Sequence, residues 1–225
     1  MKNVSVFIDG YNLYHAVDNL KKPYLKWVNP RAICKFFIQQ NLETILRVKF
    51  FTAPPIHKPG DVQDRYRAFI SALRAHDIEI VEGKFKRKLL AYYDDDGKSF
   101  TRITHEEKES DVNLSLAILE DAYEKISDRL IVITNDSDIS PAIRLARKKN
   151  SNLKISVVTP PLAKTKRANY DLADACGNIN RNRKGQVYFK TPMIREFMLE
   201  QSIMPEKIKT PDGSIISMPG KYRRI

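Results

Sequence analysis

Carboxylates follow apolar segments of the sequence that have the composition of buried strands. Asp9 ends the run at residues 4–8, and Asp136 and Asp138 follow the run at residues 130–134. Asp111 begins an amphipathic segment whose far end leads back into that second run. Because the carboxyl ends of parallel strands share one edge of a sheet, where ligands bind, we expect these four acids to lie close together.

Four crowded carboxylates repel one another unless a cation lies between them. Oxygen ligands without His or Cys are those that Mg²⁺ or Mn²⁺ prefers, and the four histidines of this chain form no pair with the spacing of a zinc site. Each acid alone also fits a local role, as a turn former or beside a helix N-terminus. Together the acids predict a site for Mg²⁺ or Mn²⁺.

The overall charge has the opposite sign to this acidic cluster. The chain has 39 Lys and Arg against 27 Asp and Glu, a net charge of +12, and residues 163–225 alone hold 13 basic and 6 acidic residues. Such an excess favours a polyanionic partner, although charge alone equally fits a well-solvated surface. A divalent metal can bind a phosphate oxygen and activate a water. Metal-dependent hydrolysis of phosphodiester bonds accounts for both signs of charge.

The elements that must position these acids are predicted by hydrophobic patterning. Continuous apolar runs, typical of strands covered on both faces, lie at residues 4–8, 46–51, 78–83, 130–134 and 155–159. Apolar stripes of helical period, or helix-start signals, lie between them at residues 61–76, 112–126 and 141–149. The alternation predicts an α/β fold with a mainly parallel central sheet flanked by helices.

Two hairpins are expected outside this sheet. Residues 84–104 contain Asp96-Gly97 between β-prone segments, and residues 207–219 place Pro211-Asp212-Gly213 at a turn. A short helix is expected at residues 169–176. The C-terminal hairpin leaves two arrangements open, because it can cover an edge of its own sheet or pair with a second copy in a homodimer.

The remaining composition points to a cytoplasmic protein without membrane contact. Cys34 and Cys176 are too few for a disulfide framework, and we expect both to be reduced thiols in the core. No apolar run approaches the ~20 residues of a membrane span, and residues 1–9 have no pattern of a secretory signal.

Three motifs in order, "FIDGYNLY", "KESDVNLSLAI" and "LIVITNDSDISPAI", resemble the NYN domain, a PIN-like nuclease fold found in LabA-like and related bacterial proteins. The resemblance covers residues 3–179. It implies a PIN-like three-layer fold, with a nuclease domain at residues 1–179 and a basic C-terminal extension at residues 180–225. It also implies a Mg²⁺- or Mn²⁺-dependent ribonuclease.

By motif position, the resemblance implies catalytic and metal-binding roles for Asp9, Asp111, Asp136 and Asp138, with Asn12 as a polar contact to the phosphate or metal. The chain departs from the usual pattern in two places. Glu109 adds an acid beside Asp111, and Asn135 stands where the family usually has glycine. Neither change removes a carboxylate.

The expected RNA-binding residues surround these motifs. Tyr11 is a candidate to stack on a base of single-stranded RNA, and Lys108 to neutralise a phosphate, although a solvated lysine also fits. Candidates to follow the RNA backbone are Lys164, Lys166, Arg167, Arg181 and Arg183.

Two other functions remain open from sequence. A catalytically inactive RNA-binding or regulatory module would keep the same acids. A phosphoacceptor or phosphatase domain would also place acids at strand ends, but phosphoacceptor domains usually have an acidic pair after the first strand, where this chain has Asp9 followed by Gly10.

Overall fold

The computed structural model describes residues 1–93, 96–163, 167–181, 187–189 and 191–224. Its centre is a five-stranded sheet in which every neighbouring pair is parallel, in the order β3-β2-β1-β6-β7. The strands are β1 (Lys2–Asp9), β2 (Glu43–Thr52), β3 (Glu79–Glu82), β6 (Arg129–Ile133) and β7 (Lys154–Val158). The predicted α/β fold with a mainly parallel sheet is confirmed.

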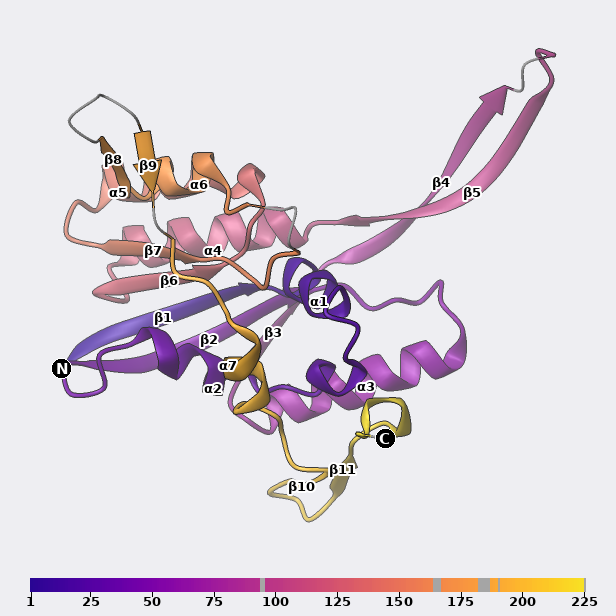
Figure 1. Cartoon of the computed structure of the whole chain (residues 1–225), viewed down its shortest axis with the longest axis horizontal. Helices are drawn as coiled ribbons and strands as arrows, with labels where there is room; N and C mark the ends of the chain where they lie inside the picture. The colour runs from indigo at the N-terminus through magenta and orange to yellow at the C-terminus, as the bar shows by residue number, and fades with distance from the viewer. Residues whose placement is uncertain (94–95, 164–166, 182–186, 190, 225) are drawn as a thin grey trace.

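Helices cover both faces of the sheet and give the molecule three layers (Figure 1). One face carries α1 (Gly10–Asp18), α2 (Pro30–Cys34) and α3 (Gly60–Arg74), and the other carries α4 (Ser110–Glu124), α5 (Ser140–Lys149) and α6 (Tyr170–Ala175). Short 3-10 turns complete the connections as η1 (Pro23–Lys26), η2 (Lys35–Phe37), η3 (Ser137–Ile139) and η4 (Gly220–Tyr222).

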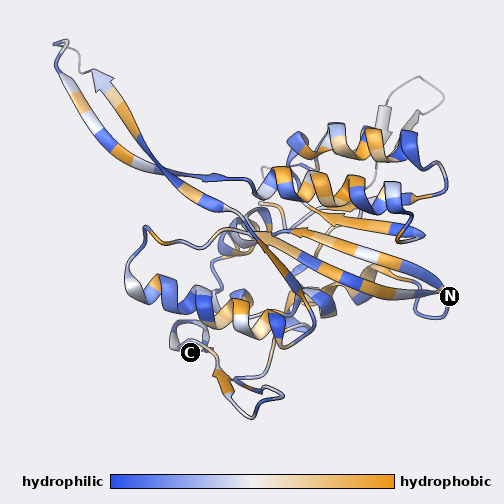
Figure 2. Ribbon diagram, turned by 180° about the vertical axis from the view of Figure 1, so that it is seen from behind, coloured by the Kyte–Doolittle hydropathy of each residue, from blue (hydrophilic) through white to orange (hydrophobic). Residues whose placement is uncertain are grey.

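Alternation along the central strand explains the two cores. Val4, Val6 and Ile8 of β1 pack in the core beneath α1 and α3, whereas Phe7 belongs to the core beneath α4 and α5. Successive side chains of a strand point to opposite faces, so a strand buried on both sides is apolar throughout. Figure 2 shows this hydrophobic colouring along the central strands.

A long antiparallel hairpin leaves the body of the protein between β3 and α4 (Figure 1). It consists of β4 (Lys84–Tyr93) and β5 (Ser99–Lys108), so the predicted hairpin is confirmed but extends four residues beyond its expected end. At its base, a Cβ atom on Gly83 would lie 2.5 Å from the Lys108 carbonyl oxygen. The absence of a side chain at Gly83 therefore lets the base of the hairpin close beside the start of α4.

The C-terminal segment completes the core on the α3 side. It contains α7 (Glu196–Glu200), β10 (Lys207–Lys209) and β11 (Ile215–Ser217), after a short pair of strands, β8 (Ile179–Arg181) and β9 (Val187–Phe189). Ile208, Met218 and Tyr222 are buried in the same core as α1 and α3, and the Trp27 indole donates a hydrogen bond to the Pro205 carbonyl at 2.9 Å.

The C-terminal hairpin is confirmed, and it packs beside α3 instead of along an edge of the central sheet. Its pairing with a second copy stays a prediction. Cys34 and Cys176 are both free and buried, as expected. No helix in the described part of the chain is long and apolar enough to cross a membrane.

A buried ion pair fastens α4 to the sheet. Asp121 is 0% exposed and accepts hydrogen bonds from Arg47 of β2 at 3.0 Å and from the Ser127 hydroxyl at 2.6 Å. Removing one partner of a buried pair leaves the other charge uncompensated. We therefore expect Asp121→Ala to lower the free energy of unfolding by about 3 kcal/mol or more in urea titrations.

The exposed pair between Arg144 and Asp174 is the matched control, at a similar 3.1 Å. Asp174→Ala should cost at most about 1 kcal/mol, because water screens an exposed pair. Equal losses in the two variants would contradict a special role for the buried pair.

Candidate functional site

Asp9 lies where β1 ends and α1 begins, at the carboxyl edge of the sheet. It is 7% exposed and caps α1, accepting a hydrogen bond from the Asn12 backbone N–H at 2.9 Å. Its other oxygen accepts one from the Thr134 hydroxyl at 2.9 Å. A Cβ on Gly10 would lie 2.5 Å from the Phe51 carbonyl oxygen, so only glycine allows α1 to start this close to β2. Two neighbouring elements thus fix the orientation of the Asp9 carboxylate.

Thr134 connects Asp9 to Asp136. The Thr134 hydroxyl accepts a hydrogen bond from the Asp136 backbone N–H at 3.0 Å while donating to Asp9. Asp136 in turn caps η3 and accepts a hydrogen bond from the Asp138 backbone N–H at 3.0 Å. The spacing between the acids after β1 and β6 is therefore set by a single buried hydroxyl.

Asn135, the departure from the expected motif, joins the loop after β6 to α1 and to the segment before α6. Its backbone N–H donates to the Asn12 side-chain oxygen at 3.0 Å, and its own side chain bonds the backbones of Arg167 and Asn169. Its φ is not positive, so nothing at this position requires glycine. The Asn12 oxygen is thereby occupied in holding the loop after β6, while Asn12 still lines the cavity of the site.

Asp111 reaches the site from the first turn of α4. The residue before the helix start, Glu109, has a φ of 80° and turns the chain sharply from β5 into α4. Glu109 forms an ion pair with Lys84 and does not line the cavity. The acid that this chain adds to the motif therefore lies outside the site. The left-handed turn separates Glu109 from Asp111.

Glu107 is an acid of the site that sequence reasoning missed. It lines the same cavity as Asp9, Asp111 and Asp136, and desolvation, with a smaller effect of Asp111, raises the pKa of its carboxyl. In β5, residues two apart share a face, which places Glu107 on the side opposite to Glu106 and Lys108. This two-residue alternation could have identified Glu107 from the sequence. The expected hairpin ended at residue 104, so residues 105–108 were not predicted as strand.

A cavity of about 460 Å³ holds the cluster. Its wall contains the acids Asp9, Glu107, Asp111 and Asp136, together with side chains of α1, Phe85 of β4, and residues 160–163. Asp138 is exposed and does not line it, although its charge acts on Asp111. The structure thus brings together three of the four predicted acids and adds a fourth.

Electrostatics within the cavity favour a cation. Desolvation raises the pKa of Asp9 to about 7, against the two hydrogen bonds that lower it, and the charges of Asp111 and Asp136 add to the rise. Desolvation and then the charges of Asp136 and Asp138 raise the pKa of Asp111 as well. None of these carboxylates forms an ion pair with a described residue.

The donors fit a hard divalent cation, because all of them are oxygen atoms and the buried one lacks a positive partner. In the described ranges, no group of three or more His, Cys, Asp or Glu side chains is arranged to hold a metal ion by itself. A cation here would therefore rely on fewer carboxylates, with water or a phosphate completing its ligands.

The predicted RNA-binding residues have different surroundings. Tyr11 donates its hydroxyl hydrogen to the Ala53 carbonyl at 2.9 Å and packs edge-on against Phe85, and it lines both this cavity and a second one of about 510 Å³. Lys108 is paired with Glu106 at 2.9 Å. Arg167 is exposed next to the cavity wall, and Arg181 ends β8. Lys164, Lys166 and Arg183 lie outside the described residues.

Comparison with known proteins identifies the family. Residues 3–179 match the NYN domain, so the chain belongs to the NYN domain family, and the expected resemblance is confirmed. The family implies a PIN-like nuclease fold. A crystal structure of a protein of unknown function from Vibrio parahaemolyticus has the same fold, with a TM-score of 0.52 and 18% identity over 87% of this chain and 94% of that one.

One relative is named for an activity other than that of a nuclease. The 6-hydroxy-3-succinoylpyridine 3-monooxygenase of Pseudomonas putida is 30% identical in a match 200 residues long that covers 74% of this chain. The match spans 62% of the length of that protein.

The raised pKa of Asp9 predicts a specific dependence of stability on pH. The folded protein binds this proton up to about pH 7, whereas the unfolded chain loses it near pH 4, so stability falls as pH rises through that interval. In EDTA, Asp9→Asn should raise the free energy of unfolding at pH 8 by up to about 4 kcal/mol, and by much less at pH 5. Urea titrations at the two pH values measure this, and a pH-independent difference would contradict it.

Proposed function

We propose that this protein is a Mg²⁺- or Mn²⁺-dependent ribonuclease that hydrolyses phosphodiester bonds at the carboxylate cavity. The observation that carries the proposal is the buried Asp9, whose pKa is raised to about 7 in a cavity shared with Asp111, Asp136 and Glu107. Within a chain of net charge +12, this is a local negative site on a basic protein. Membership in the NYN family supports the same activity.

Asp9, Asp111 and Asp136 would hold the metal. Mg²⁺ is usually bound through one or two carboxylates plus waters and substrate phosphates, which suits a cavity without a ready-made three-ligand cluster. When bound, such an ion supplies a Lewis acid for a phosphoryl oxygen and lowers the pKa of a bound water. Thr134 and the Asn12 N–H hold both oxygens of Asp9, so this ligand is oriented before any ion arrives.

Glu107 would act as the general acid or base. The pKa of its carboxyl is raised, no described basic side chain pairs with it, and it lines the same cavity as Asp9. A carboxyl with a raised pKa can take a proton from an attacking water or return one to the leaving oxygen. Asp138, exposed at the rim, would act through its charge on Asp111.

RNA would reach the cavity over the basic part of the chain. Residues 160–163 line the cavity, and the sequence continues directly into Lys164, Lys166 and Arg167. Lys and Arg beside the scissile phosphate would neutralise the RNA backbone and make binding salt-dependent. Lys108 is paired with Glu106 and would contribute through the electrostatic field of the β4–β5 hairpin.

Two other functions are candidates. An inactive RNA-binding module would show binding with a steep salt dependence and no cleavage with any metal. Acceptance of a small aromatic acid is suggested by the name of the Pseudomonas putida relative, and the second cavity, lined by aromatic and basic side chains, favours it.

Cleavage of single-stranded RNA tests the proposal directly. With Mg²⁺ or Mn²⁺, Asp111→Asn and Asp136→Asn should lower kcat by at least about 100-fold, because each removes a carboxylate facing the metal. Glu109→Gln is the matched control, since that carboxylate pairs with Lys84 outside the cavity, and it should cleave like the original protein. Equal cleavage by Asp111→Asn, or full activity in EDTA, would overturn the proposal.

Metal binding has a second readout that needs no turnover. At pH 8, Mn²⁺ should raise the thermal unfolding temperature in proportion to the logarithm of its concentration, because it binds the folded state. Asp9→Asn should remove most of this increase, and Glu109→Gln should keep it. The same increase in all three proteins would place the metal elsewhere.

A further inference from the structure

The second cavity, of about 510 Å³, lies against the acid site. It is enclosed by α1, α3, η1, η4 and the base of the β4–β5 hairpin. Its volume is typical of pockets for small organic ligands. Tyr11, His15 and Phe85 line both cavities, so one thin wall separates them. A group held in this cavity would therefore be a direct neighbour of a group held at the acids.

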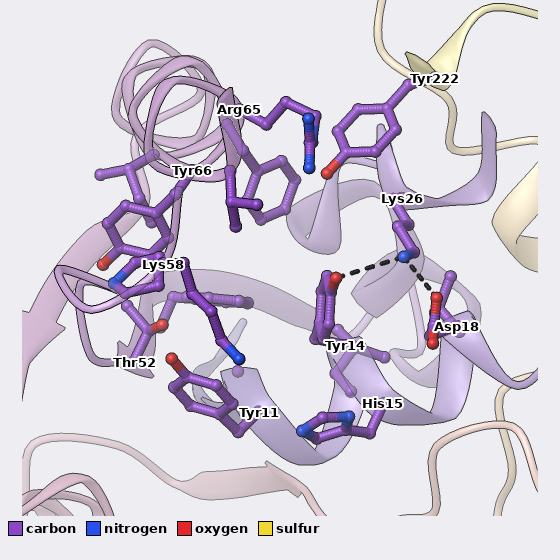
Figure 3. Close-up of a pocket in the computed structure, with 18 of the residues that line it drawn as sticks. Tyr11, Tyr14, His15, Asp18, Lys26, Thr52, Lys58, Arg65, Tyr66 and Tyr222 are labelled. Carbon is purple, nitrogen blue, oxygen red and sulfur yellow. Dashed lines mark hydrogen bonds and ion pairs between the residues drawn. The ribbon is translucent and has the colours of Figure 1, made fainter. Parts of the chain in front are cut away.

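Aromatic rings and hydroxyl groups dominate its lining. Figure 3 shows Tyr14, Tyr66 and Tyr222 around the opening, with the Tyr222 hydroxyl beside the Arg65 guanidinium. Tyr14 is 44% exposed, and Phe69, which also lines the cavity, packs edge-on against Phe50. Rings of this kind stack on planar groups, and the Tyr14 and Tyr222 hydroxyls can hydrogen-bond the polar edges of a base, whereas the Tyr66 hydroxyl donates to Glu82.

The basic side chains of the cavity differ in how far they are neutralised. Lys26 is paired with Asp18 at 2.5 Å and contacts the Tyr14 hydroxyl, and Arg65 is paired with Asp61 at 2.5 Å. Lys58 forms no ion pair with a described residue, and Figure 3 shows its side chain reaching over the cavity toward Tyr11. A free ammonium group at this wall can bind an anion.

His57, the neighbour of Lys58, adds an unsatisfied polar atom. Its ring stacks on His105 with centroids 4.4 Å apart, and its Nδ1 is buried without a hydrogen-bond partner in the described structure. Buried polar atoms are rarely left unpaired in folded proteins. The stacked His57 and His105 rings thus form part of the cavity wall, and the Lys58 ammonium group is the candidate anion-binding group beside them in the lining.

We propose that this cavity binds the nucleotide next to the cleaved phosphodiester, with its base among Tyr14, Tyr66 and Tyr222 and its phosphate at Lys58. This assignment rests on the proposed function, because the shared wall would place the adjoining phosphate of the same RNA strand at the carboxylates. The cavity would then select a base and set which phosphate is cut.

Calorimetric titration in EDTA tests the binding without any cleavage. Uridine and adenosine 5′-monophosphates should bind saturably, and the unphosphorylated nucleosides should bind more weakly. Lys58→Ala should raise Kd about tenfold, as expected for the loss of one charge-assisted hydrogen bond, and Tyr14→Ala should weaken stacking. Lys148→Ala removes the same charge from an exposed position on α5 and should leave Kd unchanged.

Nicotinate, a ring with a carboxylate, is the competing ligand. Binding of nicotinate without binding of either monophosphate would overturn the nucleotide assignment in favour of a free small aromatic acid. Absence of binding by all these ligands, or an equal loss in Lys148→Ala, would also overturn it. If the monophosphates bind as expected and no RNA is cleaved with any metal, the proposed ribonuclease fails while the nucleotide site stands.

Discussion

The structure depends on one buried carboxylate, that of Asp9, which forms no ion pair with a described basic side chain. Asp9 is held between α1 and the loop after β6 by two hydrogen bonds, yet desolvation still raises its pKa to about 7. Burying an acid in this way costs free energy when it is ionised. A turn former would need neither the burial nor the neighbouring acids, because a cap on α1 can be exposed. On the proposed function, a cation held at these carboxylates would relieve the repulsion that Asp111 and Asp136 exert on Asp9.

The central sheet positions only part of this site. It delivers Asp9 and Asp136 at adjacent strand ends, as parallel sheets of this type do. The remaining wall comes from the β4–β5 hairpin, whose base supplies Phe85, Glu107 and the turn that leads to Asp111. The second cavity adds Tyr222, from the end of the chain. An insertion and an extension thus convert a common sheet edge into two adjoining cavities.

The features that could be predicted from the sequence are those that local residue patterns control. Continuous apolar runs identified all five strands of the sheet, because a strand covered on both faces has no polar alternation. Glu107 was missed since β5 continues to Lys108, where charged residues conceal the two-residue period. Glu109 was weighed as an additional acid, but its left-handed backbone turns it toward Lys84. The second cavity joins residues from Gly10 to Tyr222, and no local pattern links such distant positions.

The wall between the cavities limits what can occupy both. Tyr11 is fixed by its hydrogen bond to Ala53 and by its contact with Phe85, so this part of the wall between the two cavities is held in place. A small aromatic acid has one charged group and can satisfy either the ammonium group or a metal at the carboxylates. A nucleic acid strand has phosphates at regular intervals with a base between them, and can satisfy both at once. On the proposed function, an anion site at Lys58 and a cation site at the carboxylates, on either side of this aromatic wall, would favour a strand over a single small molecule.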